Sequence, residues 1–361
     1  MPGTPHARGP LGLPLWTWAA PIAGAVLAAV KLAHIDLPWF ITAPILVAAV
    51  LAAVHHAEVI AHPIGEPYGT LVLAIAVTTI EVGLIVSLMI AGGPSSGAMA
   101  RDTVFAAVMI IMNGIIGLSL LSAGAHHREP EFNQAGTNAA LTVLTALTVL
   151  TMVLPNVTDA PGPYYSSGQL AFVAAVSLVL YLTFVFTQTV RHRDYFLFAG
   201  AYAGDVKPVC NQTALASLAL LVLALIGVVM AGKALAPSIS AAVAAAGAHD
   251  ALVGVIIAAI VLMPEGLAAV RAARDNRLQD SLNLALGSAL ASIGLTILAV
   301  AVVSLSLGFP LTLGLGPRDT ELLILPLFLA VLSLGRGRTT VLDGVVHLVI
   351  FAVYLFTVIN P

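Results

Sequence analysis

The chain has 361 residues, of which 60% are hydrophobic and only 9% charged, and its formal net charge is −3 at pH 7. Its mean hydropathy of +1.04 excludes an ordinary soluble domain. The small net charge gives no reason to expect nucleic acid or another strongly charged partner. A single cysteine, Cys210, excludes an intrachain disulfide.

Long apolar runs follow one another along the chain, separated by short polar gaps. A membrane-spanning helix needs about 20 such residues to cross roughly 30 Å of hydrocarbon. The runs lack the polar alternation of a membrane β-barrel, so we expect an all-α polytopic membrane protein embedded in lipid. About eleven spans are predicted, near residues 16–34, 39–57, 70–92, 103–124, 137–155, 168–190, 213–232, 250–270, 281–305, 321–334 and 340–359.

The positive charges predict how these spans are oriented. With eleven spans, ten of the fourteen Lys and Arg residues fall on the side of the N-terminus. The other four are Lys31, Arg101, Lys233 and Arg318. The positive-inside rule therefore places the N-terminus in the cytoplasm and the C-terminus outside. We expect the protein in the inner (plasma) membrane.

A polar stretch, residues 191–212, separates two hydrophobic halves that share one order of features. In each half a span with a glutamate is followed by a polar loop and then by a span containing Gly, Ser and Asn. Five spans per half make the two units enter the membrane from opposite sides, which is typical of inverted repeats. The expected parts are a retained tail and first span (1–38), a first half (39–190), a cytoplasmic linker (191–212) and a second half (213–361).

Two carboxylates, Glu81 and Glu265, lie inside long apolar runs. A charged carboxylate in hydrocarbon costs at least ~3 kcal/mol, so it is normally kept where it faces a cavity, a partner or an ion. Pro264 and Gly266 flank Glu265, and proline removes a backbone hydrogen bond within a helix. We expect an ion pathway; the alternative is an interhelical hydrogen bond made by a protonated acid.

Oxygen-bearing side chains near these glutamates suit a hard cation, which takes carboxylate, amide, hydroxyl and carbonyl ligands. Thr78 lies one turn before Glu81, and Ser288 and Ser292 are four residues apart, so each pair can share a helix face. The expected cation- and proton-binding residues are Glu81, Glu265, Thr78, Thr79, Asn113, Ser288 and Ser292. Protons and a cation would compete for the two carboxylates, and such competition is sufficient for antiport.

Four further acidic residues, Glu58, Glu66, Asp102 and Asp280, lie near predicted span ends. Glu58 and Glu66 could line a vestibule or be solvated loop residues. Asp102 and Asp280 begin the second helix of each unit, where a carboxylate complements the positive end of the helix dipole. We interpret these two as caps first and as vestibule groups second.

The histidines fall at predicted span ends, where interfacial positions are the simplest explanation. The sequence contains no phosphate loop, zinc-binding helix or Ser/His/Asp arrangement. It therefore supports neither ATP-driven transport nor a hydrolytic enzyme. We expect no enzyme activity and no cofactor. The chain is also compatible with assembly as a homo-oligomer.

Residues 57–89 and 101–121 in the first half, and 252–297 in the second, resemble the two α-repeats of the calcium/cation antiporter superfamily, cation/proton exchanger branch. The resemblance implies that Glu81 and Glu265 bind the cation and exchange it for protons. It also matches Asn113 to the asparagine of the first repeat, and Gly287 and Ser288 to the Gly-Ser start of a helix in the second. A bacterial sodium-calcium/proton exchanger is the type it implies.

The chain departs from the family's Gly-Asn-x-x-Glu element. Val77-Thr78 replaces the Gly-Asn pair in the first repeat, and Val261-Leu262 replaces it in the second. Loss of an amide ligand in both repeats weakens the case for strict calcium selectivity and adds Na⁺ and K⁺ as candidate substrates. Three alternatives stay open: an antiporter for Na⁺ or K⁺ without Ca²⁺, a passive channel and an intramembrane enzyme.

Overall fold

A computed structural model describes residues 9–64, 68–159, 162–196, 210–249 and 251–360. Within these ranges the protein is helical, and its only β pairings are two isolated bridges. The long helices are α1 (Leu15–Leu32), α2 (Trp39–Ala61), α3 (Tyr68–Gly92), α4 (Met99–Met109), α5 (Ile116–His127), α6 (Gln134–Thr148), α7 (Ser167–Phe186), α8 (Asn211–Ala245), α9 (Ala251–Arg274), α10 (Leu278–Leu307), α11 (Pro317–Leu334) and α12 (Val341–Ile359).

A π-helical segment, η4 (Ile110–Ile115), joins α4 and α5 into one continuous helix. The described residues therefore form eleven helical rods, as predicted for an all-α membrane protein. Ten of them are long and apolar enough to cross a membrane, and α11 is the exception because its first turns contain Arg318, Asp319 and Glu321. The largest difference from prediction is α8, which extends to Ala245 because Pro237 is accommodated inside the helix.

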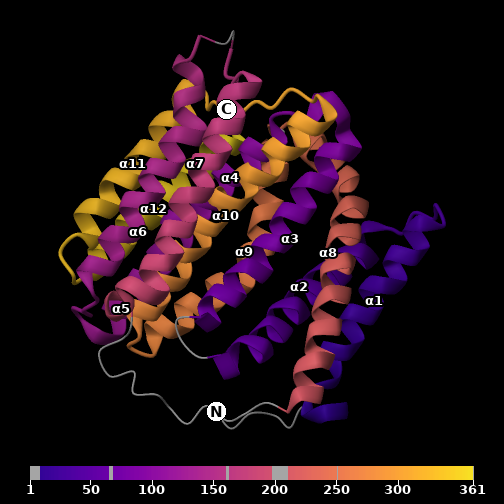
Figure 1. Cartoon of the computed structure of the whole chain (residues 1–361), viewed down its shortest axis with the longest axis horizontal. Coiled ribbons are helices and arrows are strands. Elements are labelled where there is room, and N and C mark those ends of the chain that lie inside the picture. Colours follow the sequence, from indigo (N-terminus) through magenta and orange to yellow (C-terminus); the bar gives the residue numbers. More distant parts are fainter. Residues whose placement is uncertain (1–8, 65–67, 160–161, 197–209, 250, 361) are drawn as a thin grey trace.

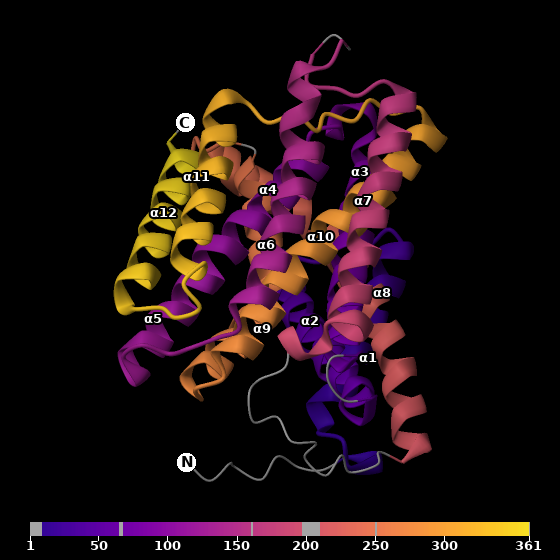
Figure 2. The same cartoon turned by 60° about the vertical axis from the view of Figure 1, so that its left-hand side comes forward.

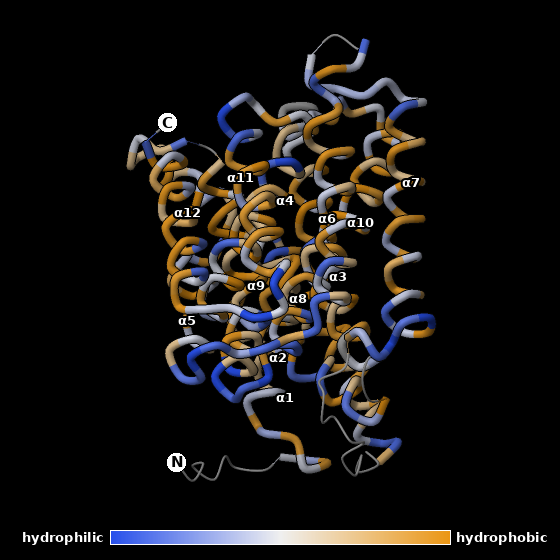
Figure 3. The backbone as a smooth tube through the Cα atoms, turned by 90° about the vertical axis from the view of Figure 1, so that its left-hand side faces the viewer, coloured by the Kyte–Doolittle hydropathy of each residue, from blue (hydrophilic) through white to orange (hydrophobic). Residues whose placement is uncertain are grey.

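The helices run alternately between the two ends of the bundle (Figure 1). We call the end at which α1 begins the near side and the opposite end the far side. Helices α1 and α8 lie at one edge, α11 and α12 lie at the other, and α3, α4, α9 and α10 lie between them (Figure 1). The turned view again shows α11 and α12 at the edge opposite α8 (Figure 2). Hydrophilic residues gather mostly in the connections at the two ends, with apolar helices between (Figure 3).

Buried apolar side chains form two clusters, one centred on α4, α5, α6 and α10 and the other on α2, α3 and α8. Helices α3 and α9 contribute to both clusters, so they lie at the junction of the two packed bodies. The first helix packs on α2 and α8. A Cβ atom on Gly24 would lie only 2.9 Å from Cα of Gly227, so these two glycines permit close contact between α1 and α8.

An extended segment, residues 309–316, crosses the far side of the bundle. Its backbone N–H groups bond to other far-side connections: Thr312 to the carbonyl of Gly97 (3.1 Å), Gly314 to that of Pro163 (3.1 Å) and Leu315 to that of Met152 (2.9 Å). Its own side chains Leu311, Leu313 and Leu315 are buried. The segment therefore covers the far side over the central helices.

Candidate cation site

Glu81 of α3 and Glu265 of α9 are both buried, with 4% and 2% of their surface exposed. Each accepts a hydrogen bond from a serine of α10. The hydroxyl of Ser292 donates to Oε1 of Glu81 (2.5 Å), and that of Ser288 donates to Oε2 of Glu265 (2.8 Å). The two carboxylates thus meet on one helix.

Helix α10 can hold both glutamates because Ser288 and Ser292 are four residues apart. Residues at that spacing lie one above the other on a helix face, with Cβ atoms roughly 6 Å apart. Both serines are buried. The spacing places two carboxyl groups and two hydroxyl groups within one helical turn of each other.

One oxygen of this group has no hydrogen bond. Oε1 of Glu265 is buried and without a hydrogen-bond partner among the described residues. A carboxylate oxygen left unpaired away from water is costly, so it calls for a proton, a water molecule or a cation. Pro264 precedes this glutamate inside α9 and has no N–H to offer the carbonyl of Ile260.

The neutral ligands expected from the sequence lie in different places. Thr78 is buried on α3, one turn before Glu81. Thr79 is exposed, and its hydroxyl donates to the carbonyl of Ile75 (2.7 Å), so it lies away from the glutamate pair. Asn113 is buried in η4, where its amide nitrogen contacts Sδ of Met109 at 3.8 Å.

Of the four acidic residues predicted at span ends, the structure describes Glu58, Asp102 and Asp280. Glu58 is exposed near the end of α2. Asp102 forms an ion pair with Arg101 (2.7 Å), and Asp280 forms one with Arg277 (3.4 Å). Glu66 lies outside the described residues.

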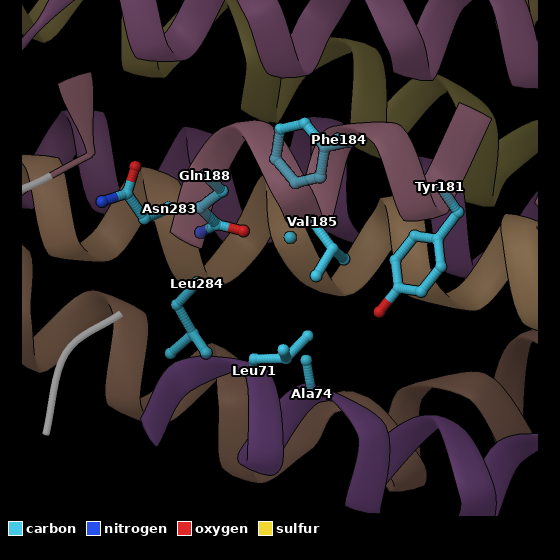
Figure 4. A pocket seen from close by; sticks show the side chains of 9 residues that line it. Leu71, Ala74, Tyr181, Phe184, Val185, Gln188, Asn283 and Leu284 are labelled. Carbon is cyan, nitrogen blue, oxygen red and sulfur yellow. The ribbon is translucent and has the colours of Figure 1, made fainter. Parts of the chain in front are cut away.

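A pocket between α3, α7 and α10 approaches the site from the near side (Figure 4). It is narrow and partly open, with room for about one water molecule. The hydroxyl of Tyr181 and the amide of Gln188 point into the space between α7 and α3 (Figure 4). Gly287, which also lines it, is the residue before Ser288. The pocket therefore reaches α10 beside the serine that binds Glu265.

The interpretation of all histidines as residues at span ends was wrong. His347 is fully buried inside α12, and His56 is fully buried in α2, where its Nε2 lies 2.8 Å from the carbonyl oxygen of Thr17. The sequence does carry a signal for His347, since it interrupts an apolar run that continues to Ile359. For His56 the signal is weaker, because the predicted span ended one residue later.

Two buried glutamates reached by hydroxyl groups from one central helix, inside a bundle of membrane-length helices, define a secondary cation transporter. A model of the sodium/calcium exchanger protein family matches residues 39–190 and 216–360, and the chain belongs to that family. It is a multi-pass membrane transporter and not an enzyme.

Two relatives extend along most of the chain. The "putative ionic transporter y4hA" of Sinorhizobium fredii (strain NBRC 101917 / NGR234) is 50% identical over 353 residues, which cover 95% of each chain. The "sodium-potassium/proton antiporter ChaA" of Escherichia coli (strain K12) is 34% identical over 319 residues, 87% of this chain and 86% of that protein. The second places the chain among cation/proton exchangers of the superfamily.

Solved structures show the same fold at low sequence identity. Native YfkE is 17% identical, with a TM-score of 0.71 over 96% of this chain and 100% of that one. The H⁺/Ca²⁺ exchanger CAX is also 17% identical, with a TM-score of 0.71 over 95% of this chain and 88% of that one. These likenesses confirm the predicted fold of an extra N-terminal helix and two inverted five-helix repeats.

Proposed function

We propose that the protein is a secondary antiporter that exports Ca²⁺ in exchange for protons, and that accepts Na⁺ and K⁺ as further substrates. The observation that carries this proposal is that Glu81 and Glu265 accept hydrogen bonds from two serines one turn apart on α10, while Oε1 of Glu265 has no partner among the described residues. Two carboxylates, two hydroxyls and the nearby Thr78 offer the oxygen ligands that a hard cation requires. The same two carboxylates can take protons instead.

Competition for this pair would couple the two ions. An empty site with two negative charges is expensive to move through the low-dielectric interior, whereas a protonated or cation-loaded site is not. Exchange between sides would therefore occur only when the pair carries protons or a cation. Alternating access of this kind is typical of inverted-repeat transporters with a site between the repeats.

We further propose that the near side is cytoplasmic, because ten of the fourteen Lys and Arg residues fall on the N-terminal side in the eleven-span prediction. The pocket beside Gly287 would then be the cytoplasmic approach to the site, in a plasma membrane. The division into residues 1–38, 39–190, 191–212 and 213–361 gives one glutamate to each repeat. Residues 197–209 of the linker lie outside the described residues.

A second candidate is an antiporter for Na⁺ or K⁺ that does not carry Ca²⁺. Two observations favour it: the absence of the amide from the Gly-Asn position of both repeats, and the name of the 34% identical E. coli relative, which describes that protein as a sodium-potassium/proton antiporter. One carboxylate neutralises a monovalent cation, whereas Ca²⁺ needs both carboxylates and about six to eight oxygen ligands in all. The loss of the two amide oxygens therefore affects Ca²⁺ binding most.

The experiment that separates the two candidates uses everted membrane vesicles with a preformed pH gradient. Ca²⁺, Na⁺ and K⁺ are added separately, and gradient dissipation is followed with a pH-sensitive dye. Vesicles lacking the protein serve as the control. A response to Ca²⁺ supports the first proposal, and a response to Na⁺ or K⁺ alone supports the second. No response to any of the three would contradict both.

A further inference from the structure

Three polar side chains from three helices meet inside the bundle. They are Asn113 of η4, Ser333 of α11 and His347 of α12, and all three are buried. The imidazole lies between the other two: Nδ1 is 3.4 Å from Oδ1 of Asn113, and Nε2 is 3.0 Å from Oγ of Ser333. The cluster ties the π-helical segment to the last two helices.

The contacts of this cluster define the hydrogen-bond roles. The amide oxygen of Asn113 can only accept, so Nδ1 of His347 carries the proton and is turned toward it, while the backbone carbonyl of Met112 is a further hydrogen-bond partner of the ring. In a neutral ring Nε2 then accepts from the hydroxyl of Ser333. The oxygen of Asn113, the atom that a hard cation would use, is therefore occupied by the imidazole.

The ring is held in place by close backbone packing. A Cβ atom on Gly117 would lie 3.1 Å from Cβ of His347, and one on Gly114 would lie 3.4 Å from the Phe351 ring. These two glycines allow α12 to approach the continuous helix that contains Asn113. The approach brings the imidazole directly against the π-helical turn.

Asn113 nevertheless lies on a segment beside the glutamate site. The η4 segment packs against both α9 and α10, which carry Glu265 and the two serines. A Cβ atom on Gly266, next to Glu265, would lie 3.2 Å from Cγ1 of Ile115. π-Helical turns are frequent at functional sites, where they change the direction of a side chain.

We propose that His347 is a positioning residue for Asn113, and that it holds the amide oxygen away from the Glu81–Glu265 pair. Because the imidazole holds Oδ1 of Asn113, this oxygen is withheld from a cation bound at the glutamates. Its loss lowers the affinity of the site for a divalent cation, which needs many oxygen ligands. This inference rests on the proposed function and deepens it. It gives this chain a means of weakening Ca²⁺ binding without changing either glutamate.

The test measures the half-saturation concentrations for Ca²⁺ and Na⁺, and the maximal rates, of proton exchange in proteoliposomes. The variants are His347→Leu, His347→Gln, Asn113→Ala and the double variant His347→Leu/Asn113→Ala. Leu removes the hydrogen bond, whereas Gln can still donate to Asn113. When the imidazole is removed, the hydroxyl of Ser333 can still donate to the carbonyl of Ala330, which lies 3.4 Å away. Ser217→Ala, a buried change in α8 at a hydroxyl without a partner among the described residues, is the matched control.

His347→Leu is expected to lower the half-saturation concentration for Ca²⁺ roughly fivefold, the equivalent of one net hydrogen bond. The value for Na⁺ should change less than twofold. The effect on Ca²⁺ should disappear in the Asn113→Ala background, and His347→Gln should behave like the wild type. An unchanged His347→Leu, or an effect that persists without Asn113, would overturn the inference.

Two further measurements keep the outcome decisive. If the wild type does not carry Ca²⁺, inhibition of Na⁺/H⁺ exchange by Ca²⁺ supplies the same binding constant. If His347→Leu does not reach the membrane, Ser333→Ala, which removes the second anchor of the ring, should shift Ca²⁺ affinity in the same direction. A wild type that exchanges no cation would instead refute the proposed function.

Discussion

The hydroxyl of Ser292 donates a 2.5 Å hydrogen bond to Glu81 across a separation of 211 residues. This bond joins a carboxylate of the first half to a helix of the second half. Ser288, one turn earlier on the same helix, makes the corresponding bond to Glu265 within the second half. Helix α10 is thus the element that brings the two glutamates together.

The first prediction concerns these two serines. Ser292→Ala and Ser288→Ala each remove one hydroxyl ligand and one hydrogen bond to a carboxyl group, but leave both carboxylates in place. Each should raise the half-saturation concentration for the transported cation about tenfold, as expected for a hydrogen bond to a charged group. Transport kinetics in vesicles measure this. Ser177→Ala, a buried serine of α7 without a partner among the described residues, should stay within twofold of wild type.

A second prediction concerns pH. Protons and cation compete for the same carboxylates, so acidification on the side from which the cation binds should raise its half-saturation concentration. The increase should be up to about tenfold per pH unit for each proton that the cation displaces. Initial rates at several pH values and cation concentrations would measure the slope. A half-saturation concentration independent of pH would show that protons bind elsewhere.

A third prediction tests the near-side pocket. A Cβ atom on Gly287 would meet nothing within 4 Å, so the first carbon of a side chain fits there without displacing its neighbours. Gly287→Leu should therefore narrow the pocket, and we expect the maximal exchange rate to fall at least about tenfold with little change in thermal stability. Gly168→Leu is the matched control, since Gly168 also faces open space and lies at the other end of α7. Equal rates for the two variants would argue against this route.

Much of the fold could be predicted because membrane spans have a strong signal in hydropathy. The glutamates could be found for a related reason, since a charged residue in an apolar run is costly and rarely accidental. The spacing of Ser288 and Ser292 showed that they share a face, although not that each would bond a different glutamate. That pairing depends on contacts between α3, α9 and α10.

The prediction from sequence missed other parts of the site. Thr79 was expected beside Glu81, yet neighbouring residues on a helix point about 100° apart, so Thr78 and Thr79 cannot both face the same partner. Helix geometry could have excluded one of them. The partner of Asn113 is His347, which is 234 residues away, and the π-helical turn that directs Asn113 has no recognisable sequence signal.

The most direct test of the central claim measures cation and proton fluxes together in proteoliposomes containing the purified protein. Wild type, Glu81→Gln and Glu265→Gln are compared, with Glu129→Gln as the control, because that glutamate is 60% exposed in a surface ion pair. We predict opposite, coupled fluxes for wild type and control, and a loss of at least about 100-fold in both site variants, since each removes one of two buried charged ligands. Cation flux without proton movement, or unchanged exchange in either site variant, would contradict a shared glutamate site.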